Sequence, residues 1–443
     1  MTLASRALPS SSRLILAALL LAIFSGPAEA DLLEYVKKPE PKFAWKIKEK
    51  IKSEQGTIYD LRLVSQVWHD ITWEHQLQVY QPKNVAPNAT MLLWNTGGSA
   101  NPGNIAFGMT LANKANAPVA FLYNIPNQPL FDGKKEDALI AETFVRYLET
   151  KDDTWPLLFP MVKSVVKAMD ALQDFAKEEW RAPIKGFIIS GGSKRGWTSW
   201  LTGAADPRVV AIAPLVIDTL NMSKQMDYQK ESFGDYSEQV KDYTERQLVP
   251  MPKTEEAKKL WQMVDPFFYR DKVTMPKFLI NGNNDPYWTV DALNLYWGDL
   301  KGDKYVCYVP NAGHDLKQQT NEAKEDRSRA TNALAAFVRM QSTGKALPKL
   351  AWKHDNDSSK LRVTVEASPA PSAARLWVAT APTRDFRKSS WIEKPAAIIK
   401  NTVAGEVAPP AEGCLAFYAD LDYEIDGIPY HLCTQIRVAG KPE

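Results

Sequence analysis

The fold is decided by the stretch Phe187-Ile188-Ile189-Ser190-Gly191-Gly192-Ser193-Lys194-Arg195-Gly196-Trp197. It consists of a short apolar strand, a glycine turn, a serine and the beginning of a helix. A strand that turns sharply into a helix holds one serine hydroxyl clear of the backbone. It also directs the first N–H groups of the helix at whatever that serine attacks. We therefore expect an α/β-hydrolase fold with Ser193 as the nucleophile.

The first 30 residues have the pattern of a secretory signal peptide. Arg6 and Arg13 precede an apolar run at 14–24, and Ala28-Glu29-Ala30 forms a small-x-small cleavage site. The apolar run is too short to span a bilayer permanently. The rest of the chain has no other long apolar segment. We expect a mature protein without an integral membrane segment, exported to the periplasm or the extracellular space.

The charge balance argues against a nucleic-acid partner. The chain contains 54 basic and 52 acidic residues, and removal of the leader leaves a net charge of about +1. Nucleic-acid binding usually shows as a basic patch or domain. Asp355-Asn356-Asp357 resembles part of a calcium loop but lacks the glycine and the distal glutamate, which predicts a turn. We expect no metal and no cofactor.

Most of the chain alternates strands with helical segments. Continuous apolar runs, which suit strands buried on both faces of a parallel sheet, occur at 91–94, 119–123, 187–189, 209–213, 278–280 and 305–308. Helical patterns occur at 138–149, 158–178, 289–299 and 323–341. Residues 57–80 alternate apolar and polar side chains, which predicts antiparallel strands at a sheet edge. We expect an α/β-hydrolase domain over residues 31–345, its mostly parallel sheet flanked by helices.

Two segments depart from this alternation. Residues 219–273 form a long insertion that carries Met, Tyr, Phe and Trp among many charges. Such an insertion is consistent with a cap over the site or with a plain surface excursion. After Gly344 the helical period disappears and strand-like runs continue. We expect residues 346–443 to form a separate all-β sandwich.

The chain has three cysteines, Cys307, Cys414 and Cys433. Export brings thiols into an oxidising compartment. Cys414 and Cys433 lie in neighbouring strand-like segments, so we predict a disulfide between them. Cys307 lies in an apolar run, which predicts a buried thiol.

A serine nucleophile needs a histidine base, and the histidine needs a carboxylate to orient it. In α/β-hydrolases these residues follow the chain order Ser, then Asp or Glu, then His. Of the five histidines, only His314 follows a sheet strand of the hydrolase domain after the serine. We therefore predict His314 as the general base.

Three carboxylates compete for the role of the acid. Asp285 follows the strand at 278–280, just past its carboxyl end, where the sites of open α/β sheets lie. Asp218 follows the preceding strand, and Asp315 adjoins the base. We favour Asp285 because the glycine and asparagines of Asn281-Gly282-Asn283-Asn284 form the tight, exposed turn that such a carboxylate needs.

The oxyanion of acyl transfer needs two backbone N–H donors. One is the amide of Lys194, and the other comes from Gly97 or Gly98, where paired glycines let the backbone approach a substrate. Lys194 and Arg195 oppose the dipole of the helix they begin, so they need local carboxylates or an anionic substrate group. Candidates for lining a substrate pocket are Arg195 and the aromatic residues Trp155, Trp197, Tyr287 and Trp288.

Several longer strings make the chain similar to one known family. They are Trp155-Pro156-Leu157, Gly192-Ser193-Lys194-Arg195-Gly196-Trp197-Thr198, Asp265-Pro266, Asn281-Gly282, Asn284-Asp285-Pro286-Tyr287-Trp288 and Gly313-His314. With these motifs the sequence resembles the PhoPQ-activated pathogenicity-related family of secreted bacterial proteins. The resemblance covers nearly all of the mature chain. It implies an α/β-hydrolase fold with Ser193, Asp285 and His314 as the triad, and it brings no settled substrate.

The turn departs from the general Gly-x-Ser-x-Gly pattern, because position 195 is Arg195 and the glycine follows at Gly196. A similar turn occurs in glucuronoyl esterases, so the change is compatible with catalysis. It makes a uronate or other sugar ester an analogy to test.

These features predict a secreted serine hydrolase that cleaves a small-molecule, saccharide or peptide ester through an acyl-enzyme. An ester is favoured over a peptide bond because it has the better leaving group. The alternatives are a peptidase of the same fold and a catalytically silent binding or virulence protein on a hydrolase scaffold.

Overall fold

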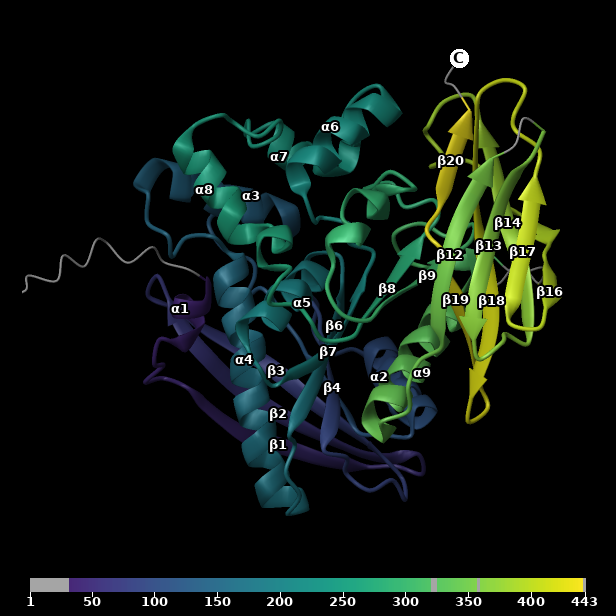
Figure 1. Cartoon of the computed structure of the whole chain (residues 1–443). Helices are drawn as coiled ribbons and strands as arrows, with labels where there is room; N and C mark the ends of the chain where they lie inside the picture. The colour runs from purple at the N-terminus through teal and green to yellow at the C-terminus, as the bar shows by residue number, and fades with distance from the viewer. Residues whose placement is uncertain (1–31, 320–324, 357–358, 441–443) are drawn as a thin grey trace, which may run out of the picture.

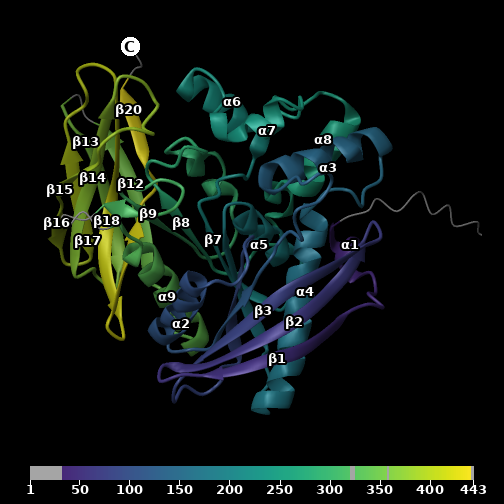
Figure 2. The same ribbon diagram turned by 180° about the vertical axis from the view of Figure 1, so that it is seen from behind.

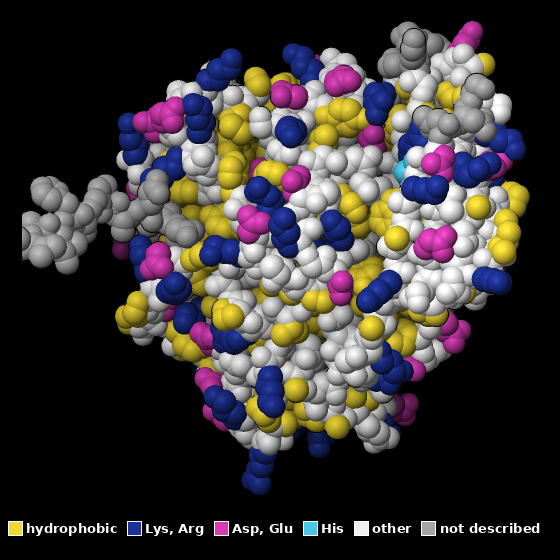
Figure 3. Space-filling view, viewed as in Figure 1, with side chains coloured by type: hydrophobic (Ala, Val, Ile, Leu, Met, Phe, Trp, Pro, Cys, Tyr) yellow, Lys and Arg dark blue, Asp and Glu magenta, His cyan; other side chains and the backbone are white. Residues whose placement is uncertain are grey.

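The computed structural model describes residues 32–319, 325–356 and 359–440. The predicted signal peptide, residues 1–30, lies outside the described residues. Within the described ranges, no helix is both long and apolar enough to cross a membrane. On the face shown in Figure 3, Lys and Arg side chains are interspersed with Asp and Glu side chains.

A nine-stranded sheet in the order β1-β2-β3-β5-β4-β6-β7-β8-β9 forms the centre of the main domain (Figure 1). Its antiparallel edge consists of β1 (Ala44–Lys52), β2 (Gly56–Trp68) and β3 (Ile71–Pro82). The parallel part consists of β5 (Val119–Leu122), β4 (Thr90–Asn95), β6 (Gly186–Gly192), β7 (Val209–Leu215), β8 (Lys277–Gly282) and β9 (Lys304–Val309). The predicted mostly parallel sheet with an antiparallel edge is confirmed, although β1 was not predicted.

Helices cover both faces of this sheet. They are α1 (Leu32–Lys37), α2 (Pro102–Ala115), α4 (Leu158–Phe175) with the π-turn η1 (Ala176–Trp180), α5 (Lys194–Ala205), and α9 (Ser328–Thr343). Helix α3 (Glu136–Thr150) lies instead beside the helices of residues 219–273 (Figure 1). On β4, Leu93 packs in a core with residues of α4 and α5, whereas its neighbour Leu92 packs in a core with residues of α2 and α9. Successive strand residues point to opposite faces, which is why these strands are apolar throughout.

The helix predicted at 289–299 is wrong. The chain instead forms two 3-10 turns, η4 (Ala292–Leu295) and η5 (Trp297–Asp299). The side chain of Gln225 donates to the carbonyl of Ala292, and that of Asn221 donates to the carbonyl of Leu295. Tertiary hydrogen bonds therefore take the carbonyl groups that a continuing helix would use.

Residues 219–273 form a helical layer above the carboxyl ends of the parallel strands (Figure 1). Its elements are α6 (Met222–Phe233), η2 (Glu238–Val240), α7 (Lys241–Thr244), α8 (Glu255–Val264) and η3 (Pro266–Tyr269). Farther along the chain, β10 (Gln318–Gln319) pairs with β11 (Glu325–Asp326). The helical layer lies where open α/β sheets place their sites.

The C-terminal part of the chain consists of two antiparallel sheets, as predicted. One contains β12 (Lys349–Asn356), β13 (Leu361–Ser368), β17 (Thr402–Val407) and β16 (Ala397–Ile399). The other contains β15 (Ile392–Pro395), β14 (Ala373–Ala381), β18 (Cys414–Ile425), β19 (Ile428–Cys433) and β20 (Arg437–Gly440). We call these residues, 349–440, the tail. It lies beside β9 and α9, at the opposite end of the sheet from β1–β3 (Figures 1 and 2).

The predicted Cys414–Cys433 disulfide is wrong, and all three cysteines are buried free thiols. Cys433 pairs across the sheet with Asp420, which is six residues from Cys414 along β18. That separation corresponds to about 20 Å at ~3.3 Å per residue, far beyond disulfide reach. The sulfur of Cys433 instead accepts from the backbone N–H of Tyr308, which places it beside β9.

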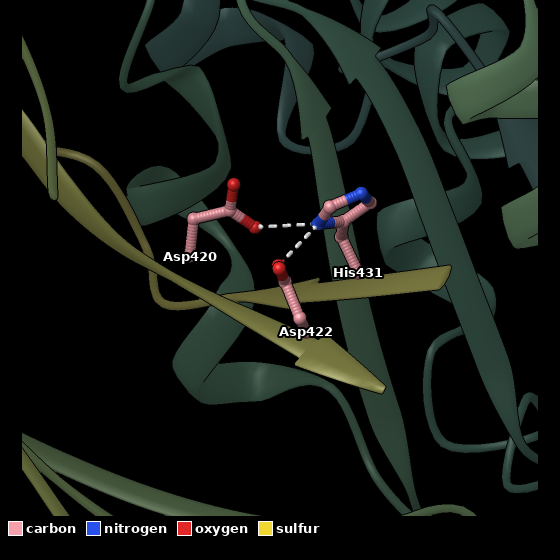
Figure 4. A group of neighbouring side chains, drawn as sticks. All are labelled: Asp420, Asp422 and His431. Atoms are coloured by element: carbon pink, nitrogen blue, oxygen red, sulfur yellow. Dashed lines mark ion pairs between the residues drawn. The ribbon is translucent and has the colours of Figure 1, made fainter. Parts of the chain in front are cut away.

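An ion-pair network joins the tail to α9. His431 lies between Asp420 and Asp422, with its Nδ1 3.3 Å and 2.9 Å from their carboxylate oxygens (Figure 4). This trio has the composition of a metal site. However, Arg329 from α9 contacts Asp420 at 2.9 Å, and Arg375 contacts both carboxylates. Since cationic side chains already balance the two carboxylates, the cluster acts as a structural ion-pair network.

The network predicts a pH-dependent contribution to stability. Burial opposes the charged form of His431, but Asp420 and Asp422 outweigh it and raise its pKa to about 9. A group whose pKa is raised in the folded state stabilises that state when it is protonated. This stabilisation is complete below about pH 6.5 and is lost as the pH rises through 9. We expect His431→Asn to lower the unfolding free energy by about 3 kcal/mol at pH 6 and by almost nothing at pH 10, measured in urea. A pH-independent penalty would contradict the ion-pair assignment.

Candidate active site

Ser193 is the single residue between the end of β6 and the beginning of α5. Its backbone has φ 57° and ψ −126°, an uncommon region for a residue with a side chain. Its N–H donates to the carbonyl of Leu215 at 2.9 Å, which fixes the turn against the end of β7. The turn is therefore the sharp strand-to-helix elbow that the sequence predicts.

Glycine at position 196 is a packing requirement. A Cβ atom on Gly196 would lie 2.5 Å from the Cγ2 atom of Ile217 and 3.0 Å from the carbonyl oxygen of Gly191. Gly191 is equally confined, because its Cβ atom would lie 2.8 Å from the carbonyl oxygen of Asn95. The two glycines let the first turn of α5 pack against β4 and β7. Since the close contacts fall at positions 191 and 196, position 195 can carry a long side chain.

Asp285 and His314 are in contact. The Nδ1 atom of His314 lies 2.8 Å from Oδ2 of Asp285, and the other carboxylate oxygen accepts from the N–H of Tyr287 at 2.9 Å. Asp285 is buried, and the His314 ring packs on that of Tyr287 with centroids 4.3 Å apart. The structure thus brings together the acid and the base that the sequence favours.

Asp218, the competing acid, has other partners. It accepts hydrogen bonds from Tyr296 and, at 2.9 Å, from Asn281. Burial and the charge of Asp285 raise its pKa to about 7 against the opposing effect of these hydrogen bonds. Asp315 is the exposed partner of Arg327 and Lys317. Of the three carboxylates, Asp285 is the one that contacts the base.

Backbone contacts hold the acid turn against the base loop. A Cβ atom on Gly282 would overlap the carbonyl oxygen of Gly313 and lie 2.5 Å from that of Ala312. The N–H of Asn284 donates to the carbonyl of Ala312 at 2.9 Å. Because no side chain separates the two segments, the positions of Asp285 and His314 are coupled.

The tail also holds both segments, through two asparagines that were not predicted as site residues. The side chain of Asn284 donates to the carbonyl of Ser389 at 2.8 Å. The side chain of Asn311 donates to the carbonyl of Trp391 at 2.9 Å and accepts from its N–H at 2.7 Å. The sequence signal was the asparagine-rich character of these turns, which alone does not reveal a partner about 80 to 105 residues away.

The cations after Ser193 pair with carboxylates of α3, as one of the two alternatives predicts. Lys194 lies 2.6 Å from Asp137, and the guanidinium of Arg195 binds both oxygens of Glu136 at 2.6 and 2.7 Å. Burial opposes ionisation of Glu136, but Arg195 outweighs it and lowers the pKa to about 2. We call these four residues the double ion pair. Both cations are buried and compensated, so neither needs an anionic substrate group.

The predicted oxyanion loop lies against Arg195. The Arg195 guanidinium occupies the position where a Cβ atom of Gly97 would be, whereas Gly98 has open space at that position. The side chain of Asn95 donates to the carbonyl of Ser190 at 2.8 Å, which joins this loop to the elbow. Glycine at 97 is therefore required by the close approach of Arg195.

Ser193 opens into a small apolar cavity of about 40 Å³. Its walls include Trp197, Tyr287 and Trp288 from the predicted aromatic set, together with Met222, Met226, Val240, Tyr243, Val249 and Trp261 from residues 219–273. The insertion therefore covers this side of the nucleophile. We call this space the apolar cavity.

Trp155, the remaining member of the predicted aromatic set, is not among the residues that line the apolar cavity. It stacks on His69, with ring centroids 3.8 Å apart, and packs against Trp68 and Phe131. A tryptophan in a loop before a helix gives no local sign of which neighbour it meets.

Comparisons with known proteins identify a family and a relative. A family model described as PhoPQ-activated pathogenicity-related protein matches residues 32–387. Autocrine proliferation repressor protein A of Dictyostelium discoideum is 32% identical over 399 residues, covering 84% of this chain and 78% of that protein.

Solved structures with similar folds include two hydrolases. Acetyl xylan esterase 1 from Thermoanaerobacterium sp. JW/SL YS485 matches with a TM-score of 0.45 and 15% identity over 64% of this chain and 86% of its own. S-formylglutathione hydrolase from Agrobacterium tumefaciens matches with a TM-score of 0.45 and 13% identity over 68% of this chain and 100% of its own. The extent of the family-model match and the identity to the Dictyostelium protein decide the assignment: the chain belongs to the PhoPQ-activated pathogenicity-related protein family.

Proposed function

We propose that the protein is an exported serine hydrolase that cleaves a carboxylic ester. The observation that carries the proposal is the 2.8 Å contact between Asp285 and His314 at the carboxyl edge of the sheet that also presents Ser193 on its elbow. Tyr287 links these groups, because it contacts the His314 ring and lines the apolar cavity with Ser193. A nucleophile, a base and an orienting carboxylate in this order are the requirements of acyl transfer.

In the proposed reaction, Ser193 Oγ attacks the ester carbonyl carbon while His314 takes its proton. The Lys194 amide and that of Gly97 or Gly98 donate to the oxyanion. The bond between the acyl carbon and the alcohol oxygen then breaks, and His314 gives the proton to that oxygen. Water, deprotonated by His314, attacks the acyl-enzyme and releases the carboxylic acid and free Ser193. Asp285 orients the ring and stabilises its cationic form.

The apolar cavity supports a small acyl group. At about 40 Å³ it exceeds the roughly 10–15 Å³ that a single water needs but leaves no room for a long chain. Its walls are mostly Met, Val, Ile and aromatic side chains, which favour an apolar group over a charged one. An acetyl group fits this description.

Replacement of the nucleophile gives the first test. We expect Ser193→Ala to lower kcat/KM for 4-nitrophenyl acetate by at least ~10³-fold, because the acyl-enzyme cannot form. Ser223→Ala, at an exposed position of α6, is the matched control and should retain wild-type activity.

The two competing carboxylates give a second matched pair of variants. Asp285→Asn should lower kcat/KM for the same ester by ~10³-fold or more, and Asp218→Asn by less than ~10-fold. Wild-type activity in Ser193→Ala would contradict the proposal, and the reverse order of the aspartates would reassign the acid.

Acyl-chain length gives the next prediction. We expect kcat/KM to fall at least ~10-fold from acetyl to hexanoyl esters, because the apolar cavity cannot hold the longer chain. Met226→Ala removes atoms from the cavity wall and should restore part of the hexanoyl rate. Both rates are measured with 4-nitrophenyl esters. A rate that rises with chain length would instead place the acyl group in the cavity of about 480 Å³ beside His314, between α2 and α9.

A further inference from the structure

A polar groove of about 1020 Å³ is lined in part by Glu136 and Arg195 of the double ion pair, whereas Asp137 and Lys194 line the apolar cavity. Gly97, Gly98 and Ser99 form one wall of the groove. The remaining walls come from β1–β3 and from the segment that follows β5. The same loop that is predicted to hold the oxyanion therefore lines this groove.

The groove wall is dense in hydrogen-bonding groups but carries little net charge. Arg62 pairs with Glu74 across β2 and β3, and Arg195 pairs with Glu136. One oxygen of Asp60 accepts from Gln76 at 2.5 Å and from Gln78 at 2.9 Å. In the described chain its other oxygen receives no hydrogen bond from a side chain. Asp60 therefore offers a fixed, partly buried acceptor to a ligand.

One buried residue of the groove lining, His75, is held in place by the protein. Its Nε2 contacts Ser65 at 2.9 Å, while its Nδ1 contacts the carbonyl of Asn124 at 3.1 Å. Burial lowers the pKa of His75 to about 4, although its hydrogen bonds to the carbonyl groups of Tyr123 and Asn124 act in the opposite direction. The ring is therefore neutral. Lys48, an exposed residue of the groove lining, stands at the β-bulge between Ile47 and Glu49. A small number of well-placed polar groups is what a specific ligand site requires.

The lining argues against the other large classes of ligand. A nucleic acid needs a cationic track, whereas the cations here are accompanied by Asp60, Glu74 and Glu136. A peptide needs apolar side-chain pockets or an open strand edge. The one aliphatic residue of the lining, Leu61, is fully buried, and strands β2 and β3 are paired on both sides, while the edge strand β1 contributes only Lys48. Hydroxyl groups can match such a surface because each one both donates and accepts.

We propose that this groove binds a neutral saccharide, which is the hydroxyl-rich half of the ester whose acetyl group enters the apolar cavity. In this proposal the two halves of the ester lie at different members of the double ion pair, because Glu136 and Arg195 line the groove whereas Asp137 and Lys194 line the apolar cavity. The inference rests on the proposed ester hydrolysis for the identity of the bond that is cleaved, but not for the binding itself.

Binding is tested with the mature Ser193→Ala protein and cellotriose by titration calorimetry. We expect saturable binding that Lys48→Trp weakens at least ~10-fold, because the larger indole occupies groove space that Lys48 lines. Asp60→Asn keeps the size of the side chain but removes the charge and should weaken binding ~5-fold or more. Lys52→Trp, an exposed position on the same strand outside the groove, is the matched control and should bind like its parent. Absence of cellotriose binding, or tighter binding of trigalacturonate or a tripeptide, would overturn the proposal.

Kinetics separate this proposal from the proposed function. With the wild-type nucleophile, Lys48→Trp should raise KM for monoacetylated cellotriose at least ~10-fold and change kcat/KM for 4-nitrophenyl acetate by less than ~2-fold. Equal effects on both substrates would overturn the groove assignment. If the wild type cleaves 4-nitrophenyl acetate but does not bind cellotriose, the groove proposal fails alone. If cellotriose binds and neither ester is cleaved, the hydrolase proposal fails alone.

Discussion

The candidate site depends on one backbone contact, that of the turn at Gly282 with the loop at Ala312 and Gly313. No side chain fits between these segments, so the carboxylate that follows one strand meets the imidazole that follows the next. Packed interiors resist even small insertions. The tail then holds both segments from outside through Asn284 and Asn311. The tail, which contributes no predicted catalytic residue, in this way helps to hold the site in place.

Features with a local physical cause could be predicted from the sequence. The turn at Ser193 has glycines on both sides, which indicated the elbow. Strands buried on two faces are apolar throughout, and the order of these apolar runs along the chain indicated the sheet. Pairings between distant segments left no such signal. Glu136 and Asp137 begin an ordinary helix, and nothing nearby indicates that they compensate Lys194 and Arg195. The wrong disulfide came from the same limit, because proximity in sequence did not report the register of β18 and β19.

The double ion pair explains how two cations can begin a helix. Unpaired, they would oppose its dipole, but carboxylates from α3 balance them, and the first turn of α5 remains able to present its N–H groups. Glu136 and Arg195 line the polar groove, and Asp137 and Lys194 line the apolar cavity together with the nucleophile. Arg195 stands where such turns usually have a glycine. Its guanidinium is bound by the carbonyl of Ile125 and by both carboxylate oxygens of Glu136, so its role is structural.

The central claim is that Ser193 is an activated nucleophile. The most direct measurement is the intact mass of the protein after reaction with a fluorophosphonate, followed by mapping of the modified peptide. The account predicts a single adduct on Ser193 that is lost in Ser193→Ala and strongly slowed in His314→Ala. An unmodified wild-type protein, or an adduct that persists in Ser193→Ala, would contradict it.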